Sequence, residues 1–121
     1  MRLKLHEIEL GTENVDITTH FFQAVLGLVP SLKQEGLTVF DAGLKGLDFN
    51  VSNHLSAGNI VLSFFTDDLA AVEEQLTKIG ISIQGPSPSH LGMTSIQFHS
   101  PEGFCIKINA AGSESPDRLT L

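Results

Sequence analysis

A strand near the end of the sequence carries two reactive side chains on one face. Residues 104–109 read F-C-I-K-I-N, and this alternation of large apolar with smaller or polar side chains predicts a half-buried β-strand. Because successive side chains of a strand point to opposite faces, Cys105 and Lys107 share one face and Ile106 lies on the other. A lysine on the second face of an inner strand needs a partner, since an unpaired buried charge is costly.

Two glutamates near the start of the sequence are the candidate partners of Lys107. Residues 3–10 read L-K-L-H-E-I-E-L and predict a strand with Glu7 and Glu9 on one face. A glutamate and a lysine brought together could join two parts of the fold, bind a carboxylate or carbonyl group of a ligand, or serve as an acid and a base. An ammonium beside Cys105 would activate its thiolate, but we favour a small buried side chain there.

The elements that must position these residues occur twice. Each half contains a strand, a helix that ends at a glycine, and three shorter strands. These elements are expected at 3–10, 14–26, around 28, 37–42 and 47–52, and again at 59–65, 68–79, 81–83, 93–99 and 104–109. The first helix has Phe22 and Val25 at helical spacing, and the second has Asp67 as its expected N-cap. Gly27 and Gly80, which end the helices, lie 53 residues apart, so the sequence predicts two copies of one βαβββ unit.

The amino-acid composition of the chain disfavours two classes of binding partner. The chain has 121 residues, 41% of them hydrophobic, which suffices for one compact domain with a core. The formal net charge is −7, and the seven Lys and Arg residues form no run, so neither nucleic acid nor an anionic membrane surface is an expected partner. The sequence has no apolar stretch long enough to span a membrane. Its single cysteine fits a reducing cytoplasm.

Three motifs follow one another in an order that is typical of one superfamily. Residues 21–28, F-F-Q-A-V-L-G-L, are similar to F-Y-x-x-x-L-G-L, and residues 66–69, T-D-D-L, are similar to V-D-D-L. Gly92 and the F-H-S-P-E-G of residues 98–103 are similar to G-x-x-x-x-x-F-x-D-P-x-G. Over about residues 3–109 the chain therefore resembles the vicinal oxygen chelate superfamily, also called the glyoxalase, bleomycin-resistance and dioxygenase superfamily.

The resemblance implies an α+β fold in which paired βαβββ modules form a curled mixed sheet around a cavity, with the helices outside. The modules would span residues 3–52 and 59–109 of a single domain at 1–109, and a C-terminal tail would follow at 110–121. The tail is rich in small and polar residues and is expected to be loose, although Leu119 and Leu121 could dock. Members of this length commonly dimerise, so the resemblance also implies a homodimer.

Members of the superfamily often hold a divalent metal through the first and last strands of each module. Counting from the motifs places the four ligand positions at Glu7, Asn50, Val61 and Lys107. Valine cannot bind a metal, an amide is a poor ligand for a transition metal, and an ammonium repels a cation. We therefore expect no metal and no other cofactor. A shift of the strand register by one residue would change this, because the ligands could then come from His6, Glu9, His90 or His99.

The side chains expected to contact a ligand lie on the cavity faces of the strands, with one histidine from the loop at 85–92. They are Glu7, Glu9, Asn50, Val61, Ser63, Phe65, His90, Cys105 and Lys107. A face that is partly apolar and carries a few charges suits a small amphipathic organic molecule. We therefore expect metal-independent binding of such a ligand.

Two enzymatic alternatives stay open. One is a metal-dependent lyase, isomerase or dioxygenase of the glyoxalase type. The other is a diverged, metal-free enzyme in which Glu7 and Lys107 are the catalytic residues.

Overall fold

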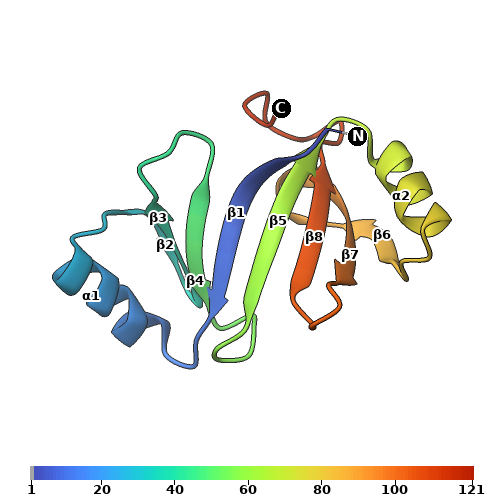
Figure 1. Cartoon of the computed structure of the whole chain (residues 1–121). Helices are drawn as coiled ribbons and strands as arrows, with labels where there is room; N and C mark the ends of the chain where they lie inside the picture. Colours follow the sequence, from blue (N-terminus) through green and yellow to red (C-terminus); the bar gives the residue numbers. More distant parts are fainter. Residues whose placement is uncertain (1) are drawn as a thin grey trace. The chain divides into compact units, whose positions relative to one another are not determined.

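The chain folds into two successive βαβββ series (Figure 1). The computed structural model describes residues 2–121. The first series consists of β1 (Lys4–Gly11), α1 (Val15–Leu26), β2 (Pro30–Gln34), β3 (Leu37–Asp41) and β4 (Asp48–Ser52). The second consists of β5 (Ile60–Thr66), α2 (Leu69–Lys78), β6 (Gln84–Pro88), a short 3₁₀ turn (His90–Gly92), β7 (Thr94–His99) and β8 (Cys105–Ala110). The predicted α+β class, with paired βαβββ modules and mixed strand directions, is confirmed.

Backbone contacts divide the chain into two compact units. The N-terminal unit comprises residues 6–61, and the C-terminal unit comprises residues 2–5 and 62–121. The first residues of β1 therefore belong to the C-terminal unit, and the first residues of β5 belong to the N-terminal unit.

In the N-terminal unit the strands follow the order β2-β3-β4-β1. Strand β1 runs parallel to β4, with Glu9 opposite Asn50, whereas β3 is antiparallel to both of its neighbours. Helix α1 covers one face of these strands through Phe22. The Phe22 ring meets the rings of Phe40 and Phe49 edge-on, at centroid distances of 5.7 and 5.2 Å.

A pair of hydroxyl groups completes the contact between α1 and β3. Thr19 and Thr38 are both buried, and the Thr19 hydroxyl donates to the Thr38 hydroxyl at 2.8 Å. Val25, which the helical spacing grouped with Phe22, is instead 63% exposed. The face of α1 that packs on the sheet is therefore defined by Thr19 and Phe22.

In the C-terminal unit the strands follow the order β5-β8-β7-β6, and β6, β7 and β8 are antiparallel. Helix α2 packs on one face through an aliphatic cluster. Its buried members are Val72, Leu76, Ile96 and Ile108. Burial of such a cluster is the main favourable contribution to the stability of a unit of this size.

Side-chain caps start both helices. Asn14 Oδ1 accepts a hydrogen bond from the backbone N–H of Ile17 at 3.0 Å and so caps α1. The second cap is Asp68, whose Oδ1 accepts from the N–H of Ala71 at 3.1 Å, so the expectation of Asp67 was wrong by one residue. Adjacent aspartates have the same capping chemistry, and the sequence pattern alone does not choose between them.

The strand expected at 81–83 lies instead at Gln84–Pro88 as β6. Ile81 and Ile83 pack beside the aliphatic cluster before the strand begins. Two prolines occupy β6, which is tolerated because β6 is the last strand in the order of its unit and one side of it needs no ladder hydrogen bonds.

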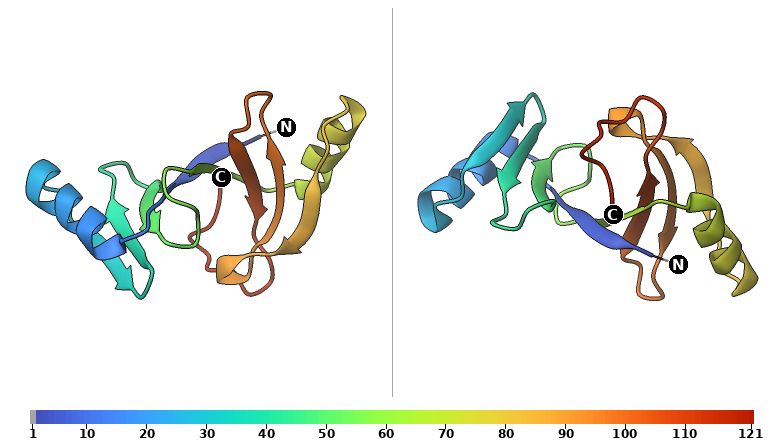
Figure 2. Two further views of the ribbon diagram at one scale, coloured as in Figure 1. Left: turned by 90° about the horizontal axis from the view of Figure 1, so that it is seen from below. Right: turned by 90° about the horizontal axis from the view of Figure 1, so that it is seen from above.

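The C-terminal segment after β8 folds back onto its own unit. Figure 2 shows this segment and α2 on opposite sides of β7 and β8. The Lys4 ammonium donates a hydrogen bond to the carbonyl oxygen of Thr120, and Leu119 and Leu121 are partly buried. A Cβ added at Gly112 would lie 2.4 Å from the carbonyl oxygen of Gly92, so the backbone passes very close there. Of the two expectations for the tail, a loose segment or docking of Leu119 and Leu121, the structure has the docked arrangement.

Within residues 2–121, neither helix combines the length and the apolar character that a membrane span requires.

Candidate functional site

The face of the N-terminal unit that points away from α1 is polar. Phe49 on β4 contacts α1. Because side chains alternate along a strand, Asn50 and Ser52 lie on the opposite face. Ser52 Oγ donates to Glu9 Oε2 at 2.5 Å, which places Glu9 on that same face. Glu7 lies two residues before Glu9 and is buried, at 7% exposure. The structure therefore gathers Glu7, Glu9 and Asn50 on one side of the sheet of this unit.

Asn50 carries an unusual buried atom. Its side chain is 6% exposed, and Oδ1 accepts no hydrogen bond from any protein group within residues 2–121. Leaving a buried acceptor unsatisfied costs about 1 to 3 kcal/mol, and native proteins contain few such groups. The amide oxygen is therefore a place where a hydrogen-bond donor of another molecule would be favourable.

A second polar face lies opposite α2 in the C-terminal unit. Ile108 packs in the aliphatic cluster under the helix, so Lys107 points to the other face. Cross-strand pairing sets Gln97 opposite Lys107 and His99 opposite Cys105. Gln97 was missed in the sequence, although its place between Ile96 and Phe98 in an alternating strand was the signal for it.

Strand β5 adds a hydroxyl group and an aromatic ring to the C-terminal unit. Phe64 packs beside the aliphatic cluster, so Ser63 and Phe65 lie on the face away from α2. Both are buried, and Ser63 Oγ has no hydrogen-bond partner within the described residues. Lys4 Nζ lies 5.9 Å from the centroid of the Phe65 ring, a cation–π distance. Val61, earlier on β5, is a buried apolar residue of the N-terminal unit.

Burial and the neighbouring Lys107 shift the pKa of the Cys105 thiol on β8 in opposite directions. Burial raises the pKa of the Cys105 thiol above its ordinary value of 9.0, and the Lys107 ammonium partly opposes this shift. Burial has the larger effect, so the group is a thiol and not a thiolate near neutral pH. Cys105 is only partly buried, and a thiol with a raised pKa is less reactive than an activated thiolate.

The ligand contact of His90 and the pairing of Glu7 with Lys107 remain predictions. His90 begins the 3₁₀ turn before β7, with its Nδ1 3.3 Å from Ser89 Oγ, and its role in ligand contact is still to be tested. Glu7 lies in the N-terminal unit and Lys107 in the C-terminal unit, so their pairing also stays a prediction.

The donor set at the four expected ligand positions does not fit a divalent metal. Glu7 offers a carboxylate and Asn50 an amide, but Val61 offers no donor and Lys107 carries a positive charge. Residues 2–121 contain no group of three or more His, Cys, Asp or Glu side chains arranged to hold a metal ion.

Known proteins share the fold of this chain but have low sequence identity to it. A scan of protein-family models finds no match, and a sequence search of curated proteins finds none either. Among solved structures, a glyoxalase/bleomycin resistance protein/dioxygenase superfamily member from Vibrio splendidus 12B01 matches with a TM-score of 0.68 and 15% identity, covering 90% of this chain and 99% of that one.

Two further matches are proteins of stated activity. Methylmalonyl-CoA epimerase from Streptomyces coelicolor, in complex with 2-nitronate-propionyl-CoA, matches with a TM-score of 0.66 and 12% identity over 91% of this chain and 98% of that one. The Mn(II)-bound glyoxalase from Novosphingobium aromaticivorans matches with a TM-score of 0.66 and 18% identity, over 94% of this chain and 41% of that one. The chain therefore has the fold of the vicinal oxygen chelate superfamily, and at these identities the likeness concerns the fold alone.

Proposed function

We propose that this protein binds a small amphipathic organic ligand without a metal. The observation that carries the proposal is Ser63 Oγ, a buried hydroxyl group without a hydrogen-bond partner in residues 2–121, on the strand face that also bears Lys107. Ligand sites combine apolar walls with a few placed polar groups. On this face Phe65 would contact the apolar part of the ligand, and Ser63, Gln97 and Lys107 would bind its polar part.

The polar face of the N-terminal unit supports the same chemistry. Asn50 presents a buried acceptor, while the Glu9 carboxylate is already bound by the Ser52 hydroxyl group. Hydroxyl or amino groups of a ligand are donors that would satisfy Asn50. The single cysteine, Cys105, supports a reducing, cytoplasmic location for this activity.

The enzymatic alternatives differ from this proposal in what they need. A glyoxalase-type enzyme needs a metal, which the side chains at the four positions are poorly suited to hold. A metal-free enzyme needs Glu7 and Lys107 close to one substrate and needs both for turnover.

Metal content and metal response are the first experiment. We expect mass spectrometry of freshly purified, untagged protein to find far less than one metal per chain. Added nickel, zinc or manganese should leave the melting temperature unchanged, because only a species that binds the native state raises it. Lys107→Glu, which restores a carboxylate at the fourth position, should gain a small response to these metals. Near one metal per chain in the wild type would contradict the proposal and favour the glyoxalase-type alternative.

Ligand binding is tested with 1-naphthol, a neutral amphipathic probe. Titration followed by amide chemical shifts should move the signals of Gln97 and Lys107 saturably, with no turnover of the probe. Lys107→Gln should weaken binding about threefold, as expected for one partly exposed charged contact. If the wild type instead turns the probe over, and Lys107→Ala loses this activity while its fold stays intact, the protein is the metal-free enzyme.

We also propose that the chain forms a homodimer through the outer stripe of α1. Ile17, Phe21 and Val25 recur every four residues along the helix and are each more than half exposed, which is unusual for a monomer. No Lys or Arg lies in α1, which disfavours an anionic membrane as the partner, whereas a two-fold contact can bury the same stripe on both copies.

The dimer is tested by measuring mass in solution. The double variant Ile17→Ser/Phe21→Ser should shift light scattering from two chains to one. Leu44→Ser is the matched control, since it changes an equally exposed apolar residue of the same unit outside α1. A wild-type protein that is monomeric at high concentration would refute the proposal.

A further inference from the structure

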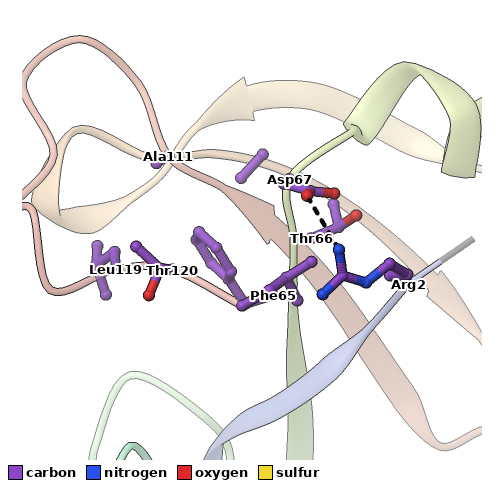
Figure 3. A pocket seen from close by; sticks show the side chains of 9 residues that line it. Arg2, Phe65, Thr66, Asp67, Ala111, Leu119 and Thr120 are labelled. Carbon is purple, nitrogen blue, oxygen red and sulfur yellow. Dashed lines mark ion pairs between the residues drawn. The ribbon is translucent and has the colours of Figure 1, made fainter.

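A pocket of about 450 Å³ lies at one end of the sheet of the C-terminal unit. Four segments line it, namely the chain start at Arg2, the end of β5 at Phe65, Thr66 and Asp67, the end of β8 at Ala110 and Ala111, and residues 119–121. Figure 3 shows the Arg2 and Asp67 ion pair at one side, Leu119 and Thr120 at the other, and Phe65 between them. A volume of this order suits a small organic molecule.

The walls of the pocket are apolar on one side. Phe65 is almost fully buried, and Leu119 and Leu121 bring two further apolar side chains from the C-terminal segment. Their position is held by the hydrogen bond from the Lys4 ammonium to the Thr120 carbonyl oxygen. The C-terminal segment thus supplies an ordered wall of the pocket.

Charged side chains of both signs lie at or beside the pocket. Arg2 and Lys4 are cationic near the pocket, and Asp67 is the carboxylate on its lining. Arg2 Nη1 and Asp67 Oδ2 are 3.9 Å apart, which is longer than a hydrogen bond, and both side chains are mostly exposed. The guanidinium therefore retains donors in a fork that matches a carboxylate.

We propose that this pocket binds small organic carboxylates with an apolar chain. The carboxylate would displace Asp67 from Arg2, and the chain would lie against Phe65, Leu119 and Leu121. A cationic amine could pair with Asp67 among the lining side chains but would be repelled by Arg2 and Lys4. The inference goes beyond the proposed function, because it requires neither Lys107 nor Ser63, although Phe65 borders both sites.

Three probes of equal chain length test the charge of the ligand. Octanoate, 1-octanol and octylamine should be titrated into the wild-type protein at pH 7 while amide chemical shifts are followed. We expect octanoate to bind most tightly and to move the amide signals of Thr66, Ala110 and Ala111. Tighter binding of octylamine than of octanoate would overturn the proposal.

Substitutions on the rim give effects of opposite sign. Arg2→Gln should weaken octanoate binding about fivefold, whereas Asp67→Asn should strengthen it about twofold by removing the competing carboxylate. Both side chains are exposed, so both variants should fold. Leu119→Ser should weaken all three probes by a similar factor, because it removes apolar contact and leaves the charges unchanged.

Lys107→Gln separates this inference from the proposed function. We expect it to leave octanoate binding unchanged while it weakens the binding of 1-naphthol. Octanoate binding that is lost in Lys107→Gln and retained in Arg2→Gln would refute the carboxylate pocket and assign the acid to the polar face of β7 and β8. Octanoate binding that is lost in Arg2→Gln and retained in Lys107→Gln would support the carboxylate pocket, whether or not 1-naphthol binds.

Discussion

Thr19 and Val72 occupy the same place in the two repeats, 53 residues apart, the same spacing as the helix-ending glycines Gly27 and Gly80. Both are buried and both join a helix to its sheet. In the N-terminal unit the contact is a hydrogen bond between two hydroxyl groups, from Thr19 to Thr38. In the C-terminal unit Val72 belongs to a cluster of aliphatic side chains. The same backbone arrangement can thus be stabilised by a satisfied polar pair or by apolar packing alone.

The outer faces of the two helices differ in the same way. Helix α2 carries Glu73, Glu74 and Lys78, whereas α1 exposes large apolar side chains. Helix α1 therefore has less apolar burial inside and more apolar surface outside than α2. The exposed apolar side chains of α1 are the ones that the proposed homodimer would bury.

The largest effect is expected in the aliphatic cluster of the C-terminal unit. Ile96→Ala removes a fully buried side chain and should lower the free energy of unfolding by about 2 to 5 kcal/mol. Urea denaturation followed by far-UV circular dichroism measures this. Ile79→Ala is the control, since Ile79 is 60% exposed and should lose much less. Equal losses at the two positions would show that the cluster is not the core.

Opening the hydroxyl pair of the N-terminal unit should have the next largest effect. Thr19→Val leaves the Thr38 hydroxyl group buried without its donor and should cost about 1 to 3 kcal/mol. The double variant Thr19→Val/Thr38→Val should recover most of that loss, because it makes the contact apolar like its counterpart at Val72. If the double variant is less stable than the single one, the two units do not share one interchangeable packing scheme.

Two buried serines should respond differently to the same change. Ser52→Ala removes the donor to Glu9 and should cost about 1 to 3 kcal/mol, because the bond involves a charged group. Ser63→Ala removes a hydroxyl group without a partner in the described residues and should change stability by less than about 0.5 kcal/mol, or increase it. Thermal melts of both variants provide the measurement. A large loss in Ser63→Ala would show that this hydroxyl group has a structural role.

The smallest effect concerns pH and Cys105. Burial raises the pKa of this thiol in the folded state above its ordinary value of 9.0. The protonated thiol then contributes stability that is fully present below pH 9 and is lost as the pH rises through the higher folded pKa. Cys105→Ala should therefore flatten the decline of the melting temperature above pH 9. Lys107→Gln should extend that decline to higher pH and enlarge the total loss, since removing the opposing charge raises the folded pKa further, and a smaller loss would contradict the assignment.

Alternation along single strands made much of this structure predictable. Phe49 on β4 and Ile108 on β8 identify the helix-facing side, and Asn50 and Lys107 then follow on the other side. The repeat also predicted the order of elements, because a glycine ends each helix at the same spacing. These features depend on neighbours within a few residues of one another.

Features that depend on distant partners were not predictable. Thr19 faces the sheet and Val25 faces solvent because Thr38 provides a hydroxyl partner that helical periodicity does not include. The pocket depends on a hydrogen bond between Lys4 and Thr120, which lie 116 residues apart in the sequence. The composition of the C-terminal tail had instead predicted a loose segment. Contacts of this kind become visible only when the chain is folded.

The close passage of Gly112 over Gly92 gives a way to recognise other chains that share the pocket. Any side chain at position 112 would collide with the backbone of the loop before β7, so the C-terminal segment can follow this path only with glycine there. Gly92 itself has a φ of +70°, a value that favours glycine. Two glycines twenty positions apart, spanning the last two strands, therefore form a signature that distant sequences can be searched for even where the lining residues differ.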